Sequence, residues 1–301
     1  TQAAGSPMNL FLQLLVTGIV IGSIYALLAL GFTLIYKATD VVNFAQGELL
    51  LVGAYICLHT TVTYRVPFFA SFALTLAFTF LMGFLIEKIF LRRMIGEPII
   101  AIIMLTIGLS SVMRSLVIIV WGTDTRTFPE VFSQVPVVIF GLSISRVYLY
   151  SIFAVAIFLG LFSLFFKKSK IGVAMRAVAC DQQAALSMGI DVKRIFALSW
   201  AIAAVVSAVG GIFLGNINGI NTSLAHFGLK VFPVVILGGL DSIAGAIVGG
   251  LIIGILENLA GGYLDPLIGG GAKELFPFII MVLVLMIKPY GLFGTVKVEK
   301  V

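Results

Sequence analysis

Charged residues are scarce in this sequence. Only 11% of its 301 residues are charged, whereas 60% are hydrophobic. An ordinary soluble domain carries about 25% charged residues, so the composition excludes that class of protein. Uncharged runs over 66–86, 147–166 and 195–229 approach or exceed the roughly 20 residues that cross a bilayer as a helix. Because a helix satisfies its own backbone N–H and C=O groups, we predict an all-α polytopic membrane protein.

The motifs of enzymes and metal proteins are also missing. Cys57 and Cys180 show no metal-ligand or disulfide spacing, and His59 and His226 stand alone. No H-E-x-x-H helix or G-x-S-x-G turn occurs, and the glycine-rich segment 269–273 lacks the spacing of a phosphate-binding loop. We therefore expect no catalytic site, no metal site and no cofactor in this chain.

The net charge of +6 does not indicate nucleic-acid binding, because the basic residues lie at the ends of apolar segments. This is the distribution of Lys and Arg in the cytoplasmic loops of membrane proteins, so the expected partner is the lipid bilayer and not nucleic acid. Residues 1–7 are interpreted as an expression scar before a first span that begins almost at once. We expect a single transmembrane domain over 8–301.

Hydropathy divides the chain into eight apolar segments, 10–36, 49–64, 67–91, 99–121, 147–166, 195–215, 229–257 and 275–293. The loop 167–194 carries six basic residues against two acidic ones, whereas 122–146 carries two of each sign. Since cytoplasmic loops are rich in Lys and Arg, we predict that 167–194 faces the cytoplasm and 122–146 faces outward.

The charges near the C-terminus conflict with eight full crossings. Eight crossings would place both termini outside, whereas Lys288, Lys297 and Lys300 favour a cytoplasmic tail. We expect segment 229–257 to enter and leave on one side as two half-helices. Its interruptions are proline, glycine and polar residues: Pro233, Gly238, Gly239, Asp241 and Ser242.

A second interruption, 40–48, separates the first two apolar runs. Irregular backbone at membrane depth is tolerated only where protein or a water-filled cavity surrounds it, so both breaks are predicted to line a path. Paired interrupted segments also indicate an inverted repeat, although glycine is simply frequent in membrane helices. The residues predicted to line the path are Asn43, Phe44, Gln46, Gly47, Glu48, Gly238, Gly239, Asp241 and Ser242.

Three ionisable residues within or beside apolar segments have alternative interpretations. Glu48 either lines the path beside Asn43 and Gln46 or caps the helix start. For Asp241 we favour an ordinary helix N-cap. Arg114 lies about two turns from the outer end of its segment, so we expect its side chain to snorkel to the interface.

The basic loop contains a short predicted helix. Asp181 suits an N-cap and Gly189 suits the position after the helix, which leaves about seven helical residues. A helix this short is marginal in water and needs a partner surface. Ala184 and Ala185 are small enough to permit close approach. The alternative is that the helix packs on the protein's own cytoplasmic face.

This short helix resembles the E-A-A-x-x-x-G coupling loop of ABC importer permeases, which docks on the ATPase subunit; here it reads Gln183-Ala-Ala-Leu-Ser-Met-Gly189. Further motifs make the whole chain from Met8 similar to the H-type permease subunit of bacterial branched-chain amino-acid ABC importers. They are Gly22-Ser-Ile-Tyr-Ala-Leu-Leu-Ala-Leu-Gly31, Asn43-Phe-Ala-Gln-Gly-Glu48, Gly53-Ala-Tyr55, Leu237-Gly-Gly-Leu-Asp-Ser-Ile-Ala-Gly-Ala-Ile-Val-Gly-Gly250 and Lys288-Pro-Tyr-Gly-Leu-Phe-Gly294.

The resemblance implies an inner-membrane heterodimer with a second homologous permease. It also implies two ATP-binding subunits, which hold ATP and Mg, and a periplasmic binding protein that captures Leu, Ile or Val. The residues implied in ATPase coupling are Arg176, Asp181, Gln183, Ala184, Ala185, Gly189 and Ile190. Gln183 stands where the general pattern has Glu, so a salt bridge from that position to an ATPase arginine is not available.

Other functions remain open at this point. Close relatives within the same family carry urea, short amides or other amino acids. A different class, the ion-coupled carrier or channel, would equally lack an ATP motif. Such a carrier has no use for a capped, alanine-rich cytoplasmic helix, so we favour the importer subunit, which catalyses nothing itself.

Overall fold

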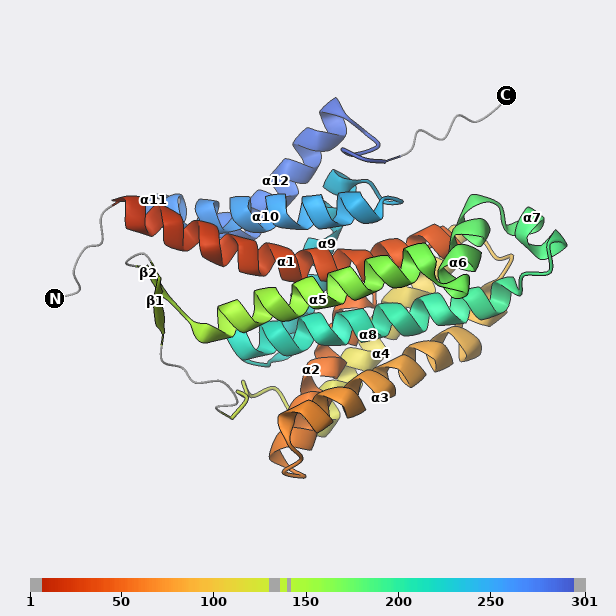
Figure 1. Ribbon diagram of the computed structural model, residues 1–301, viewed down its shortest axis with the longest axis horizontal. Coiled ribbons are helices and arrows are strands. Elements are labelled where there is room, and N and C mark those ends of the chain that lie inside the picture. Colours follow the sequence, from red (N-terminus) through yellow and green to blue (C-terminus); the bar gives the residue numbers. More distant parts are fainter. Residues whose placement is uncertain (1–6, 130–135, 140–141, 295–301) are drawn as a thin grey trace. The chain divides into compact units, whose positions relative to one another are not determined.

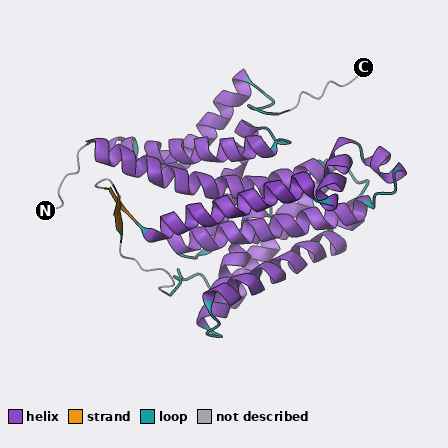
Figure 2. Cartoon of the chain, in the orientation of Figure 1, coloured by secondary structure: helices purple, strands orange, loops and turns teal. Residues whose placement is uncertain are grey.

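The computed structural model describes residues 7–129, 136–139 and 142–294, and helices dominate them (Figures 1 and 2). The α-helices are α1 Pro7–Thr39, α2 Gln46–Val62, α3 Phe68–Ile89, α4 Ile99–Trp121, α5 Arg146–Lys168, α6 Lys170–Cys180, α7 Gln182–Ser187, α8 Val192–Asn218, α9 Phe227–Gly238, α10 Ile243–Tyr263, α11 Asp265–Ile268 and α12 Ala272–Ile287. Two 3-10 segments are η1 Leu91–Met94 and η2 Thr222–His226. The short strands β1 Val137–Ile139 and β2 Leu142–Ile144 pair antiparallel. The predicted all-α class is confirmed.

Six helices in the described ranges are long and apolar enough to cross a bilayer: α1, α3 with η1, α4, α5, α8 and α10. The expected eight segments are therefore approximate. Segments 49–64 and 275–293 correspond to α2 and α12, which have 17 and 16 residues. At 1.5 Å per residue these helices are about 24–26 Å long, slightly short of the roughly 30 Å hydrocarbon core.

The interrupted segment 229–257 doubles back. Lys230 on α9 reaches Glu257 on α10, and a Cβ on Gly238 would meet the backbone of Gly245, so the two helices run antiparallel. With 12 residues, α9 matches the expected half-helix. The expectation is wrong for α10, because its 21 residues are long enough to span a bilayer. Glycine is common in membrane helices, so the glycines within α10 do not end this helix.

Pro233 does not interrupt the helix as expected, because it lies inside α9, which continues to Gly238. Proline removes a single N–H donor, and neighbouring groups in a membrane helix can compensate for that loss. The break is confined to the residues between α9 and α10. Among the predicted interruptions, the glycine pair and the following Asp241 and Ser242 therefore mark it correctly.

Contacts divide the chain into two compact units. One comprises Thr1–Ala29, Glu130–Ala156 and Lys230–Val301, and the other comprises Leu30–Pro129 and Ile157–Leu229. We call them unit 1 and unit 2. The expected scar at 1–7 lies, except for Pro7, outside the described residues, as do Lys297 and Lys300.

In unit 2, α8 is the central helix. In the most apolar 18-residue window of α8, 83% of the residues are buried, whereas in that of α4 only 17% are buried. Glycines let α2 and α3 approach α8 at backbone distance. A Cβ on Gly53 would lie 2.6 Å from the Cα of Ala208, and one on Gly83 would lie 2.6 Å from the carbonyl oxygen of Trp200. Small residues at helix contacts are typical of membrane bundles.

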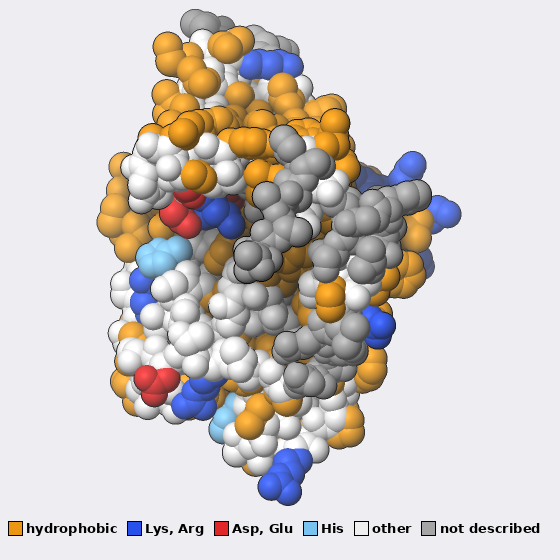
Figure 3. All heavy atoms as spheres, turned by 90° about the vertical axis from the view of Figure 1, so that its left-hand side faces the viewer, with side chains coloured by type: hydrophobic (Ala, Val, Ile, Leu, Met, Phe, Trp, Pro, Cys, Tyr) orange, Lys and Arg blue, Asp and Glu red, His pale blue; other side chains and the backbone are white. Residues whose placement is uncertain are grey.

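In unit 1, the first part of α1 packs along α10, which lies beside it in Figure 1. A Cβ on Gly22 would lie 2.9 Å from the Cα of Leu251, so the two backbones are in near contact. The surface is largely apolar. Figure 3 looks onto the end of the molecule that lies at the left of Figure 1, and there hydrophobic side chains gather at the top and along the rim, while charged and other polar groups occupy much of the centre.

Candidate functional site

The first predicted path segment is a buried turn in unit 2 that connects α1 to α2. The side-chain oxygen Oδ1 of Asn43 accepts a hydrogen bond from the backbone N–H of Ala45 at 2.9 Å. Its Nδ2 donates to Oε1 of Gln46 at 3.1 Å. Asn43 is 1% exposed and Gln46 is 2% exposed. These local bonds fix the backbone where α2 begins, a common role of Asn in turns.

The start of α2 is also held by neighbouring elements of unit 2. Nε2 of Gln46 donates to Oγ of Ser207 on α8 at 2.6 Å, and the backbone N–H of Phe44 donates to Oγ1 of Thr106 on α4 at 3.4 Å. Gly47 lies against the end of η2, because a Cβ there would meet the carbonyl oxygen of Ala225. Asn43, Phe44, Gln46 and Gly47 are therefore brought together inside the unit.

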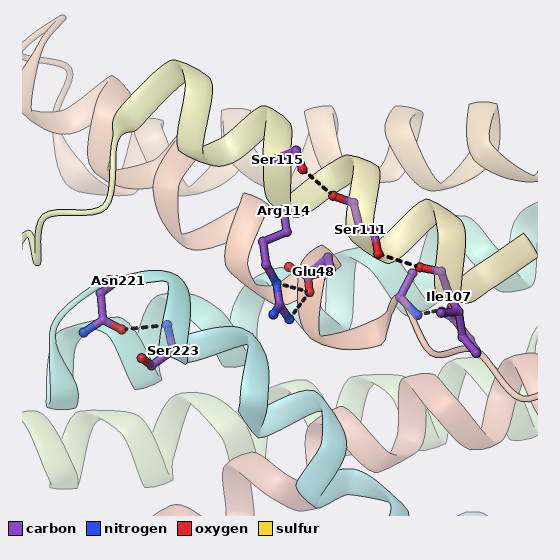
Figure 4. A network of polar contacts seen from close by, with 9 residues as sticks. Glu48, Ile107, Ser111, Arg114, Ser115, Asn221 and Ser223 are labelled. Atoms are coloured by element: carbon purple, nitrogen blue, oxygen red, sulfur yellow. Dashed lines mark hydrogen bonds and ion pairs between the residues drawn. The ribbon is translucent and has the colours of Figure 1, made fainter. Parts of the chain in front are cut away.

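Glu48 pairs with Arg114 of α4 (Figure 4). Oε1 of Glu48 accepts from Nε of Arg114 at 3.0 Å and from Nη2 at 2.6 Å. The expected snorkelling of Arg114 is wrong, since the guanidinium turns inward to a carboxylate that is only 3% exposed. The alternative role of Glu48 as a cap is also wrong, because its Oε1 binds Arg114 and its Oε2 has no hydrogen-bond partner among the described residues. Burial explains the pairing, since an isolated buried carboxylate is very costly.

The second predicted path segment lies in unit 1, between α9 and α10. Gly239 has φ of +106°, a conformation that residues with a side chain rarely adopt. The carbonyl of Leu237 accepts from the N–H of Leu292 at 2.8 Å, and that of Gly238 accepts from the N–H of Phe293 at 3.0 Å. The chain after α12 therefore satisfies the last carbonyls of α9. This explains physically why the motif at 288–294 accompanies the broken segment.

The N-cap of α10 is Ser242 rather than the expected Asp241. Oγ of Ser242 accepts from the N–H of Gly245 at 3.0 Å. Ser242 immediately precedes the first helical residue, Ile243, whereas Asp241 is one position too early. The nine predicted path residues thus form two sets, one in each unit. Their role in transport stays a prediction, as does the inverted repeat.

A charged cluster in unit 1 was missed by the sequence reasoning. Nζ of Lys230 lies 2.8 Å from Oε1 of Glu257 and 3.0 Å from Oε2 of Glu274. The hydroxyl of Tyr25 donates to Oε2 of Glu257 at 2.7 Å. The Lys230 side chain is 6% exposed and that of Glu257 is fully buried. This cluster joins α1, α9, α10 and α12.

A signal for this cluster was present in the sequence. Lys230 and Glu257 lie at opposite ends of the apolar segment 229–257, where each alone suggests an interfacial residue. A segment that folds back on itself brings its two ends together. Opposite charges at those ends are then expected to pair, because intramembrane ionisable residues usually have partners.

The predicted short helix of the cytoplasmic loop is present as α7. Oδ1 of Asp181 accepts from the N–H groups of Gln183 and Ala184 at 2.8 and 2.9 Å, and Gly189 has φ of +81°. Both end signals are therefore confirmed, and the helix has six residues. Ala184 is exposed, but Ala185 is 3% exposed and packs on its own chain. Leu186 and Met188 are instead exposed, at 57% and 83%.

Arg176 contacts its own chain. Its guanidinium donates to the carbonyl oxygens of Phe166 and Lys167 in the last turn of α5, and it lies over the Phe166 ring at 5.5 Å. Basic side chains commonly bind the free carbonyls at a helix C-terminus. Ile190, at the end of the predicted coupling set, is half-buried.

Comparison with known proteins gives consistent matches. The family model described as "Branched-chain amino acid transport system / permease component" matches residues 14–285. The chain is 31% identical to the high-affinity branched-chain amino acid transport system permease protein LivH of Escherichia coli K12, over 97% of this chain and 98% of that protein. Identity to BraD of Pseudomonas aeruginosa, with the same description, is also 31% over the same shares. A probable LivH of Methanocaldococcus jannaschii is 30% identical over 92% of this chain and 90% of its own length. No solved structure matches.

Proposed function

Since this chain belongs to the branched-chain amino acid transport system permease family, we propose that it forms the path by which an ABC importer carries Leu, Ile or Val. The chain is a transport subunit and a multi-pass protein of the inner membrane. Permeases of ABC importers generally work with ATPase and binding-protein components. Our proposal specifies a second homologous permease as partner, two ATP-binding subunits that hold ATP and Mg, and a periplasmic binding protein that delivers the amino acid.

The observation that carries this proposal is the geometry of α7. A helix of six residues is marginal by itself, yet α7 is capped at both ends and contacts α6 and α8, and its Ala185 is buried. Around Ala185, the helix exposes Ala184 and Leu186 to solvent, and Met188 is exposed directly after it. Exposed apolar side chains on a rigid, short helix suit insertion into a groove of a partner. Movement of an ATPase subunit would then be transmitted through α7 to α8.

The path itself is proposed to use the polar groups at the two breaks. Asn43, Gln46 and Glu48 supply amide and carboxylate groups in unit 2, and Ser242 with the Gly238–Gly239 backbone supplies others in unit 1. In the conformation described here, Asn43 bonds to Gln46, while Gln46 also bonds to Ser207 and Glu48 to Arg114. As the subunit changes conformation, hydrogen bonds from these side chains to a zwitterionic substrate would replace some of their bonds within the protein.

The test of coupling is a tryptophan at the exposed face of α7. Ala184→Trp in the reconstituted transporter is expected to lower ATP-driven uptake at least tenfold while leaving membrane insertion unchanged, because the enlarged side chain obstructs docking. Ile119→Trp is the matched control, since Ile119 is 78% exposed on α4. Normal uptake together with normal stimulated ATP hydrolysis in Ala184→Trp would refute the coupling role.

Two further measurements address the alternatives. Calorimetry of the cognate binding protein with leucine, valine and urea separates the branched-chain substrate from urea, and tight binding of urea alone would contradict our choice. Purification separates the importer from an ion-coupled carrier or channel. Recovery of this chain alone, active in liposomes without ATP, would favour the carrier.

A further inference from the structure

A cavity of about 180 Å³ lies in unit 2 where α3 ends and α4 begins, beside α8. Leu91, Ile102 and Phe196 form part of its apolar wall, and Gln182, the first residue of α7, reaches it from the cytoplasmic loop. Basic residues follow the end of α3, and the loop that contains Gln182 is the most basic of the chain. The cavity therefore opens toward the cytoplasmic side.

Two buried polar atoms belong to residues that line this cavity. Oε1 of Glu87 and Nε1 of Trp200 have no hydrogen-bond partner among the described residues. Glu87 is 1% exposed and Trp200 is fully buried. The other carboxylate oxygen of Glu87 already binds Nη2 of Arg92 at 3.0 Å. Buried polar groups are nearly always hydrogen-bonded, so an acceptor and a donor left over at one cavity point to a ligand.

The packing of α3 on α8 places these two side chains close together. Gly83 touches the backbone of Trp200, since a Cβ there would lie 2.6 Å from its carbonyl oxygen. Glu87 follows Gly83 by one helical turn and lies on the same face of α3. Glu87 on α3 and Trp200 on α8 therefore line the same cavity from two packed helices.

The chemistry of the lining selects the ligand. A free carboxylate oxygen suits an ammonium group, an indole N–H suits a carboxylate, and the apolar wall suits an aliphatic side chain. Glu97 also lines the cavity and disfavours a purely anionic ligand. One water needs roughly 10–15 Å³ of such a cavity, so the volume accommodates a molecule of several heavy atoms.

We propose that this cavity binds an apolar α-amino acid from the cytoplasmic side. The ammonium group contacts Glu87, the carboxylate contacts Trp200, and the side chain packs near Ile102. This site is separate from the proposed path, since Asn43, Gln46 and Glu48 do not line it. The proposal rests on the proposed function only for the choice of leucine as the probe.

The test is equilibrium dialysis of radiolabelled leucine with the complete transporter in lipid nanodiscs, without the binding protein. Leucine is expected to bind saturably. N-acetyl-leucine, which lacks the ammonium group, is not expected to compete. Ile102→Trp fills the cavity and is expected to weaken binding at least tenfold, whereas Met104→Trp is the control, because Met104 is 59% exposed on the same helix and does not line the cavity. Glu87→Gln is expected to weaken binding similarly while retaining the shape of the cavity.

Three results would overturn the proposal: no saturable binding, which means that the cavity holds only water; binding unchanged by Ile102→Trp, which places leucine elsewhere, including on the path; or equal competition by N-acetyl-leucine. ATP-driven uptake by the same preparation with the binding protein separates this inference from the proposed function. Leucine uptake without binding at the cavity refutes the inference alone, whereas uptake of urea but not leucine refutes the proposed substrate.

Discussion

The two breaks end and restart helices by different means. In unit 2, side chains stabilise the break: Asn43 bonds to Gln46, Gln46 also bonds to Ser207, and Glu48 pairs with Arg114. In unit 1, the backbone stabilises it, because the chain after α12 donates to the last carbonyls of α9. Lipid offers no hydrogen bonds, so each break needs protein partners. The comparison shows that two similar polar, glycine-containing sequences can satisfy the hydrogen-bonding groups of a helix break with different partners.

The largest effect is expected from the charged cluster beside the second break. Glu257→Ala removes the fully buried carboxylate that pairs with the buried Lys230 and leaves it the exposed Glu274, which we expect to lower the free energy of unfolding by about 3 kcal/mol. Thermal denaturation of the purified chain in detergent measures it. Glu274→Ala is the control and should cost less, because its side chain is 71% exposed. An equal loss in both variants would contradict the central role of Glu257.

The second-largest loss of stability is expected from the ion pair at the first break. Arg114→Ala leaves the Glu48 carboxylate buried without its cation, and we expect a loss of about 2 kcal/mol, because hydrogen bonds to charged groups contribute roughly 1.5–3 kcal/mol. The double variant Glu48→Gln with Arg114→Met removes both charges and should recover part of the loss. A double variant less stable than Arg114→Ala would show that the carboxylate has another partner.

The backbone-stabilised break should depend on glycine. Gly239→Ala forces a side chain into φ of +106° and against Gly294, so we expect a loss of about 1–2 kcal/mol. Gly108→Ala is the matched control, because nothing lies within 4 Å of a Cβ there and it should be neutral or slightly stabilising. The same thermal assay applies, and equal stability of both variants would remove the distinction between the breaks.

The smallest effect is expected from a single amide contact at the first break. Ser207→Ala removes the oxygen that Nε2 of Gln46 reaches at 2.6 Å, which should cost about 1 kcal/mol. Ser199→Ala on the same helix is the control, since its hydroxyl bonds only within α8, to the carbonyl of Ile195. A Ser207→Ala chain as stable as the control would mean that the polar contact contributes little to the break.

Much of the architecture was predictable because it depends on local properties. Apolar length predicted the membrane helices, and Asp181 with Gly189 predicted α7, because a capping side chain and a positive φ act within one turn. The break after Gly238 was also predictable. Gly239 adopts a positive φ and Ser242 caps the next helix, and both act within one turn, whereas Pro233 alone did not interrupt α9.

Errors arose where the partner is distant in sequence. Arg114 was expected to reach the interface, and its carboxylate partner lies 66 residues away on α2. Ala185 was expected to face a partner, although the fold turns it against its own chain. In each case hydropathy gives the depth of a residue in the membrane but not the direction in which its side chain points.

The sequence by itself determined that this chain is a helical membrane protein, where the short helix α7 begins and ends, and which transport family the chain resembles, because backbone satisfaction in lipid and helix capping are local requirements. Only the tertiary structure decided that Lys230 and Glu257 form a buried pair, that the chain after α12 completes the second break, and that Glu87 and Trp200 line one cavity. Those contacts join residues from different helices. They depend on how closely glycines let the helices pack, which no single segment specifies.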